Sequence, residues 1–173
     1  MKNLILSVIL LMAISLKAQK GKDFPSIIGL TLEGKAMHLP MKNGKRTVVA
    51  VVFSRSAEDD LKKWAAPLYE AFADRQTSEL GMTAPEQVNF FFIPFIGGMK
   101  KMVEEFKKTT DKALWPYVMD TDKMDMKLQA KLLGISDLNS PYIMLLDKDG
   151  KVQEFQSGPF KQDKLEKIED LLD

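Results

Sequence analysis

The stretch SPYIMLLDKDGKVQEFQ, residues 140–156, is the most informative part of the chain. Tyr142 to Leu146 is an uninterrupted apolar run, which predicts a β-strand. The next residues, 147–151, combine Asp, Lys and Gly and predict a tight turn. Val152 to Gln156 is then expected to return as a second strand. Together these segments predict an antiparallel hairpin near the end of the chain.

A further strand-forming segment lies at Thr47 to Phe53, where β-branched and aromatic residues follow one another. A run that is apolar on both faces belongs in the middle of a sheet covered by helices on each side. Ser54-Arg55-Ser56 ends this run. Ser56 is expected to cap the following helix, because acidic residues that favour a helix N-terminus come next. These acids are Glu58, Asp59 and Asp60.

The rest of the chain alternates in the same way. Apolar residues at helical spacing after Ser56 predict a helix that contains Pro67. The other expected elements are a hairpin in 30–39, a loop in 75–87, a strand in 88–96, a helix opened by Gly97-Gly98, a strand in 115–120, and helices in 124–133 and 161–172. This order predicts an α/β fold with a central mixed β-sheet and helices on both faces.

The amino-acid composition limits the classes of protein to which this chain can belong. The chain has 173 residues, of which 45% are hydrophobic and 28% charged, and its net charge is +1. A globular core is therefore expected. Lysines are scattered among acids and form no basic stripe with aromatic residues, so we expect no nucleic-acid partner.

The first residues resemble an export signal. Lys2 precedes an apolar run from Leu4 to Leu16, which is too short to span a bilayer of about 30 Å. Ala18 provides the small residue that a signal peptidase requires. We therefore expect residues 1–18 to be a signal peptide and 19–173 a single exported domain, periplasmic or secreted. The alternative is an uncleaved N-terminal anchor.

Several segments resemble the thioredoxin-like superfamily, in particular its peroxiredoxin-like branch. They are Phe24-Pro25, the strand from Val48 to Phe53, the helical Pro67, residues 115–120 and residues 140–152. The last of these is similar to the cis-proline, strand and hairpin of that branch. Trp64-Ala65-Ala66-Pro67, Leu133-Gly134 and the strand at Tyr142 also resemble the thioredoxin-like family of mitochondrial ATP synthase assembly factors. The resemblance implies a thioredoxin-like fold over residues 24–173.

The chain departs from the superfamily at its reactive site. The Cys-x-x-Cys pair of thioredoxins would fall on Asp59 to Lys62, or one residue earlier at Glu58, and the whole sequence contains no cysteine. A thiolate is the nucleophile in disulfide exchange and in peroxide reduction. The chain therefore cannot perform thiol redox chemistry with its own side chains, and we expect no catalytic residues.

Other ligand sites have plainer explanations. Asp120, Asp122 and Asp125 superficially resemble a calcium loop, but the glycine and terminal glutamate of that loop are missing. The sole histidine, His38, together with Met119, Met124 and Met126 suggests a copper site. Copper chaperones of this fold rely on a cysteine pair, and methionine is a common core filler. We expect no metal and no cofactor.

Peptide binding is the better-motivated function. In the resembled fold, the residue before the cis-proline pairs its backbone with an extended peptide, and here that residue is Ser140. The expected binding residues are Ser54, Arg55, Asp59, Asp60, Trp115, Ser140 and Pro141. The sequence thus predicts a non-catalytic protein-binding or chaperone-like module whose partner is a protein or peptide, including a membrane-associated complex of the envelope. The alternatives are a redox-pathway or copper-handling protein with a bound cofactor, and a structural envelope protein.

Overall fold

The computed structural model describes residues 19–72, 88–96, 107–108, 110–121 and 124–172. The strands in this part are β1 (Ile27–Thr31), β2 (Ala36–Leu39), β3 (Thr47–Val52), β4 (Asn89–Pro94), β5 (Met119–Asp120), β6 (Tyr142–Leu146) and β7 (Val152–Ser157). The helices are α2 (Arg55–Phe72), the 3₁₀ helix η2 (Lys112–Tyr117), α4 (Met126–Leu132) and α5 (Gln162–Glu169). The expected signal peptide, the loop in 75–87 and the helix from Gly97 lie outside the described residues.

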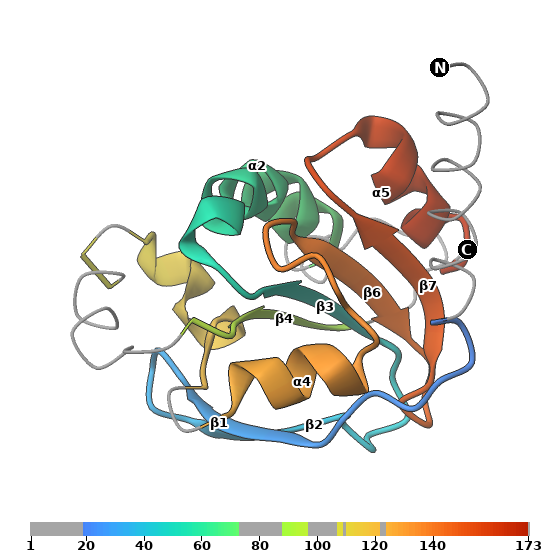
Figure 1. Cartoon of the computed structure of the whole chain (residues 1–173), viewed down its shortest axis with the longest axis horizontal. Helices are drawn as coiled ribbons and strands as arrows, with labels where there is room; N and C mark the ends of the chain where they lie inside the picture. Colours follow the sequence, from blue (N-terminus) through green and yellow to red (C-terminus); the bar gives the residue numbers. More distant parts are fainter. Residues whose placement is uncertain (1–18, 73–87, 97–106, 109, 122–123, 173) are drawn as a thin grey trace, which may run out of the picture.

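The central sheet has the order β4-β3-β6-β7 and is mixed, as predicted (Figure 1). β3 is parallel to β4 and antiparallel to β6, and β6 forms an antiparallel hairpin with β7. All six residues of β3 are buried, because both of its faces are covered. The hairpin turn is held by Asp147, whose Oδ1 accepts from the N–H groups of Asp149 at 2.9 Å and Lys151 at 2.8 Å.

Two cores lie on opposite faces of the central sheet. Val48, Ala50 and Val52 point to one face, where they pack with α2 and α5. Val49 and Val51 point to the other face, where they pack with α4 and with the β1–β2 hairpin. Figure 1 shows α2 and α5 on one side of the sheet and α4 with β1 and β2 on the other. The chain therefore places helices on both faces, as its sequence predicts.

The β1–β2 hairpin belongs to a second sheet of order β2-β1-β5. Its turn uses Gly34, whose φ of +86° is a conformation that favours glycine. The strand expected in 115–120 is largely wrong, since Lys112–Tyr117 form η2 and only residues 118–120 are extended. Pro116 cannot donate to a sheet, and the Asp111 side chain caps η2 by accepting from the Ala113 N–H.

The start of α2 also differs from the expectation. Ser54 and not Ser56 provides the hydroxyl oxygen that accepts from the Ala57 N–H, at 3.4 Å. The helix begins at Arg55, so Ser56 already lies inside it. Only Glu58 of the three acids lies in the first turn. Pro67 lies within α2, as predicted.

The implied cis-proline at Pro141 is not found. The cis peptide bond among the described residues is Leu39–Pro40, so Ser140–Pro141 has the trans form that X–Pro bonds prefer. The Pro141 carbonyl accepts from the Gly158 N–H at 2.9 Å, which extends the β6–β7 pairing by one step.

The outer side of β7 is covered at its start by the segment that precedes β1. The Gly21 N–H donates to the Val152 carbonyl at 2.7 Å, and the Val152 N–H donates to the Lys22 carbonyl at 2.9 Å. The Phe24 N–H donates to the Gly150 carbonyl at 2.9 Å. Residues 19–24 therefore lie along the edge of the central sheet. In the described part of the chain, no helix is long and apolar enough to cross a membrane.

Candidate functional site

The start of α2 and the loop before β6 are joined by side-chain hydrogen bonds. The hydroxyl oxygens of Ser54 and Ser56 lie 2.8 Å apart. Both hydroxyls donate to Asn139 Oδ1, Ser56 at 2.9 Å and Ser54 at 3.4 Å. The predicted site residues Ser54 and Arg55 are thereby brought next to Ser140 and Pro141, as the binding hypothesis requires.

Asp137 organises the loop that carries Ser140 and Pro141. Its carboxylate accepts from the Asn139 N–H at 2.9 Å and from the Ser140 hydroxyl at 2.6 Å. Its backbone carbonyl accepts from the Tyr142 hydroxyl at 2.5 Å. Burial, and to a smaller degree the nearby Asp137 charge, raises the pKa of Tyr142 to about 12. The loop is therefore anchored to the first residue of β6.

The acids of α2 form ion pairs with lysines one turn further on. Lys62 Nζ lies 3.3 Å from Glu58 Oε1 and 3.2 Å from Asp59 Oδ1, and Lys63 Nζ lies 2.7 Å from Asp60 Oδ1. The hydrogen bond to Asp59 raises the pKa of Lys62, although partial burial opposes this. The acids at the start of α2 are thus paired with lysines of the same helix, and the side chain of Asp59 is exposed.

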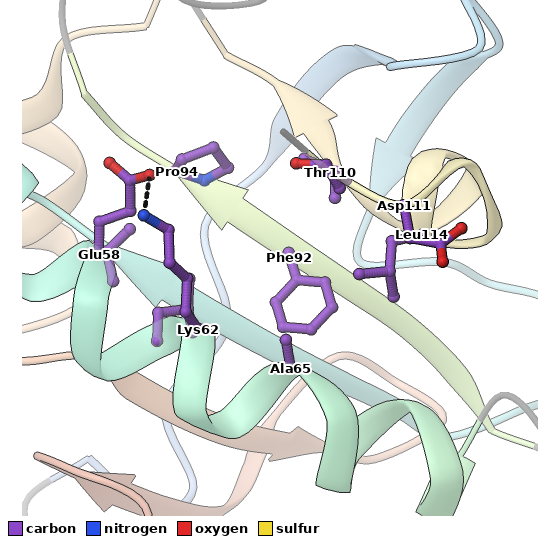
Figure 2. A pocket seen from close by; sticks show the side chains of 11 residues that line it. Glu58, Lys62, Ala65, Phe92, Pro94, Thr110, Asp111 and Leu114 are labelled. Carbon is purple, nitrogen blue, oxygen red and sulfur yellow. Dashed lines mark ion pairs between the residues drawn. The ribbon is translucent and has the colours of Figure 1, made fainter. Parts of the chain in front are cut away.

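A cavity of about 390 Å³ lies beside this part of α2. Most of its lining is apolar, and its polar lining residues are Glu58, Lys62, Thr110 and Asp111. The apolar lining residues are Val52, Leu61, Ala65, Phe92, Pro94, Leu114 and Val118. Figure 2 shows α2 on one side of the cavity, β4 behind it and the segment with Thr110 and Leu114 on the opposite side. The cavity therefore opens where the parallel strands β3 and β4 end, the usual ligand position in α/β sheets.

Trp115 occupies a different environment from the other predicted site residues. It lies in η2, is half-buried against the core beneath α2, and donates from Nε1 to the Thr110 carbonyl at 3.2 Å. The ammonium groups of Lys107 and Lys112 lie 5.7 and 5.9 Å from its ring centre. Its neighbour in η2, Leu114, is one of the residues that line the cavity, whereas Trp115 is not among them.

The carboxylates and the histidine that suggested a metal site form no cluster in the described part of the chain. Among those residues, no group of three His, Cys, Asp or Glu side chains is placed to hold a metal ion. Asp125 caps α4, its Oδ1 accepting from the N–H groups of Lys127 and Leu128. His38 is exposed, and its Nε2 lies 2.9 Å from the Ser26 hydroxyl. Asp122 lies outside the described residues.

The list of expected binding residues leaves out several residues of this site. Ser56, Asp137, Asn139, Glu58 and Lys62 all hold or line it. The run of Asp137, Asn139 and Ser140 before a strand is typical of a loop with local side-chain bonds, and this was the signal available. Nothing local in the sequence indicates that Asn139 meets Ser56.

Solved structures of thiol-disulfide proteins and of a peroxiredoxin-like protein are similar to this chain. The thioredoxin domain of a thiol-disulfide oxidoreductase from Bacteroides vulgatus is 20% identical, with a TM-score of 0.62 over 89% of this chain and 98% of that chain. A thiol:disulfide interchange protein from Bacteroides sp. is 21% identical, with a TM-score of 0.60 over 88% and 90% of the two chains. A peroxiredoxin-like protein from Aquifex aeolicus is 17% identical, with a TM-score of 0.54 over 88% and 86%. These likenesses show a thioredoxin-like fold.

A match between the amino-acid sequence and a family model shows the family of this chain. Residues 12–171 match the family model described as ATP10 protein. The chain belongs to that family. A comparison with curated proteins gave no match. Both resemblances found in the sequence, to the thioredoxin-like superfamily and to the assembly factors, are therefore confirmed, and this ATP10-family chain carries the superfamily fold without its cysteines.

Proposed function

We propose that this chain is a non-catalytic, exported assembly factor that binds a protein segment of a membrane-associated complex. The observation that carries the proposal is the start of α2. Where the resemblance to thioredoxins implies a pair of reactive cysteines, this chain holds Glu58, Asp59 and Asp60 paired with lysines, beside an open apolar cavity. Membership of the ATP10 family supports the assembly role and the class of complex.

The proposed binding face consists of Ser54, Arg55, Asp59 and Asp60 at the start of α2, together with Ser140 and Pro141 before β6. The hydrogen bonds through Asn139 and Asp137 hold the two parts in a fixed relation. Preorganisation of this kind lowers the entropic cost of binding an extended segment. Trp115 is not included in the face, because its ring contacts lysines and its Nε1 bonds within its own segment.

Photo-crosslinking in the native host tests this proposal. A photo-reactive phenylalanine analogue replaces Asp59, whose side chain is 85% exposed. The matched control replaces Asp149, an exposed aspartate in the β6–β7 turn at the opposite end of β6 from Pro141. We expect position 59, and not position 149, to capture a subunit of a membrane-associated complex. Equal capture from both positions, or none from position 59, refutes the proposal.

A further inference from the structure

We infer that the cavity beside α2 receives a large, uncharged apolar side chain of the bound client segment. This inference deepens the proposed function and rests on it. It names the chemistry of the client, which the fold and family leave open.

The walls of the cavity indicate that its occupant is large and apolar. Phe92 from β4, Leu114 from η2 and Ala65 from α2 face the space from three directions (Figure 2). At about 390 Å³ the cavity falls within the range of pockets that hold small ligands, so it accommodates a large side chain. Burying such an apolar side chain raises affinity by about 10- to 100-fold.

The charged residues at the rim of the cavity indicate that the client side chain is uncharged. Glu58 and Lys62 both line the cavity and form an ion pair with each other, which Figure 2 shows as a dashed line. The Glu58 side chain is only 19% exposed, and its carboxylate is paired with Lys62 Nζ at 3.3 Å. A charged client residue in the cavity would lose its hydration without gaining an unpaired partner from this ion pair. The third charged lining residue, Asp111, is exposed to water, and its Oδ1 accepts from the Ala113 N–H at 2.9 Å. The lining therefore offers no buried charge that lacks a partner, and it favours an uncharged client side chain.

The position of the cavity connects it to the proposed binding face. The cavity lies on the β4 side of β3, whereas Pro141 precedes β6 on the other side of β3. The first turns of α2 stand between these two places, and Lys62 joins the cavity rim to Asp59. A segment that crosses the start of α2 reaches both the loop at Pro141 and the cavity.

Two neighbouring alanines of α2 provide a matched test. Ala65 lines the cavity and is half-buried, whereas Ala66 is exposed and is not among the lining residues. Ala65→Leu fills the cavity, and Ala66→Leu adds the same group outside it. With the photo-reactive residue at position 59, we expect Ala65→Leu to lower the capture yield at least tenfold and Ala66→Leu to change it less than twofold. The captured segment, mapped by mass spectrometry, is expected to be apolar and uncharged.

The failures of this inference and of the proposed function are distinguishable. Capture that persists in Ala65→Leu, or a captured segment that is charged, overturns the inference and leaves the proposed function standing. Retention of a small apolar molecule by the purified wild-type protein in native mass spectrometry also overturns it. Absence of capture in the wild-type background refutes the proposed function.

A second measurement covers the case in which Ala65→Leu does not fold. The captured segment is synthesised with a fluorescent label, and its central apolar residue is replaced by Asp in a second peptide. Fluorescence anisotropy with the wild-type protein is expected to give at least tenfold weaker binding of the Asp peptide. Equal binding of the two peptides overturns the inference.

Discussion

Tyr142 links the stability of the binding loop to pH. Its side chain is buried, and its hydroxyl donates to the Asp137 carbonyl at 2.5 Å. Tyr142→Phe removes this bond and leaves the ring in place. We expect the variant to lose about 1 kcal/mol of unfolding free energy at pH 8, the usual net contribution of one such bond.

Alkaline pH lowers the stability of the wild type through Tyr142. The pKa of Tyr142 is about 12 in the folded protein, against a pKa of about 10 for an unfolded tyrosine. Because the folded-state pKa is raised, this contribution to stability is fully present below about pH 10 and is lost as pH rises toward 12. By pH 11 the wild type loses about 1.4 kcal/mol through this residue, and the phenylalanine variant loses none.

Urea unfolding at pH 8 and pH 11, followed by tryptophan fluorescence, measures both effects. Other groups that titrate in this range are shared by the two proteins, so the difference between the proteins isolates Tyr142. We expect the wild type to be about 1 kcal/mol more stable at pH 8 and the two proteins to be nearly equal at pH 11. A difference that stays constant between these pH values refutes a buried, hydrogen-bonded Tyr142.

Three further substitutions test other parts of the fold by urea unfolding. Trp64→Phe removes the bond from Nε1 to the Gly158 carbonyl at 3.0 Å and part of a fully buried ring, and should cost about 1–3 kcal/mol. Gly134→Ala places a side chain at a φ of +65° and against Gln19, and should cost about 1–2 kcal/mol, whereas a neutral result would contradict the backbone at the end of α4. Lys20→Met removes the partner at 2.5 Å from the mostly buried Glu154 carboxylate and should cost about 1–3 kcal/mol, so an unchanged midpoint would place Lys20 in solvent.

The secondary structure of segments that are buried on every side could be predicted from the sequence. The secondary structure of segments that depend on distant partners could not. β3 and β6 are buried along their whole length, so their composition alone identifies them. The segment 115–120 was predicted as a strand because it is apolar. Its conformation is decided instead by Pro116 and by the Asp111 cap, and the pairing of β5 with β1 joins residues far apart in the sequence.

The proximity of the two segments of the candidate site was predicted from the resemblance and not from local patterns. The resemblance placed the start of α2 beside Pro141, and the structure brings these two segments together. The bond between Ser56 and Asn139 spans 83 residues, and the cavity arises where α2, β4 and η2 meet, so neither is visible in a local pattern. Trp115 was assigned to the site because it is a large aromatic residue, yet its own segment satisfies its indole nitrogen.

The bonds between residues 19–24 and the start of β7 have a consequence for handling the protein. An uncovered outermost strand is a template on which another copy can add its own strand, and such addition leads to aggregation. The Gly21 N–H bonds to the Val152 carbonyl, and the Lys22 carbonyl bonds to the Val152 N–H. A second molecule would otherwise pair with these two backbone groups of Val152. A recombinant fragment trimmed to begin at Phe24 would expose these groups, so we expect it to form oligomers at concentrations where the longer chain stays dispersed.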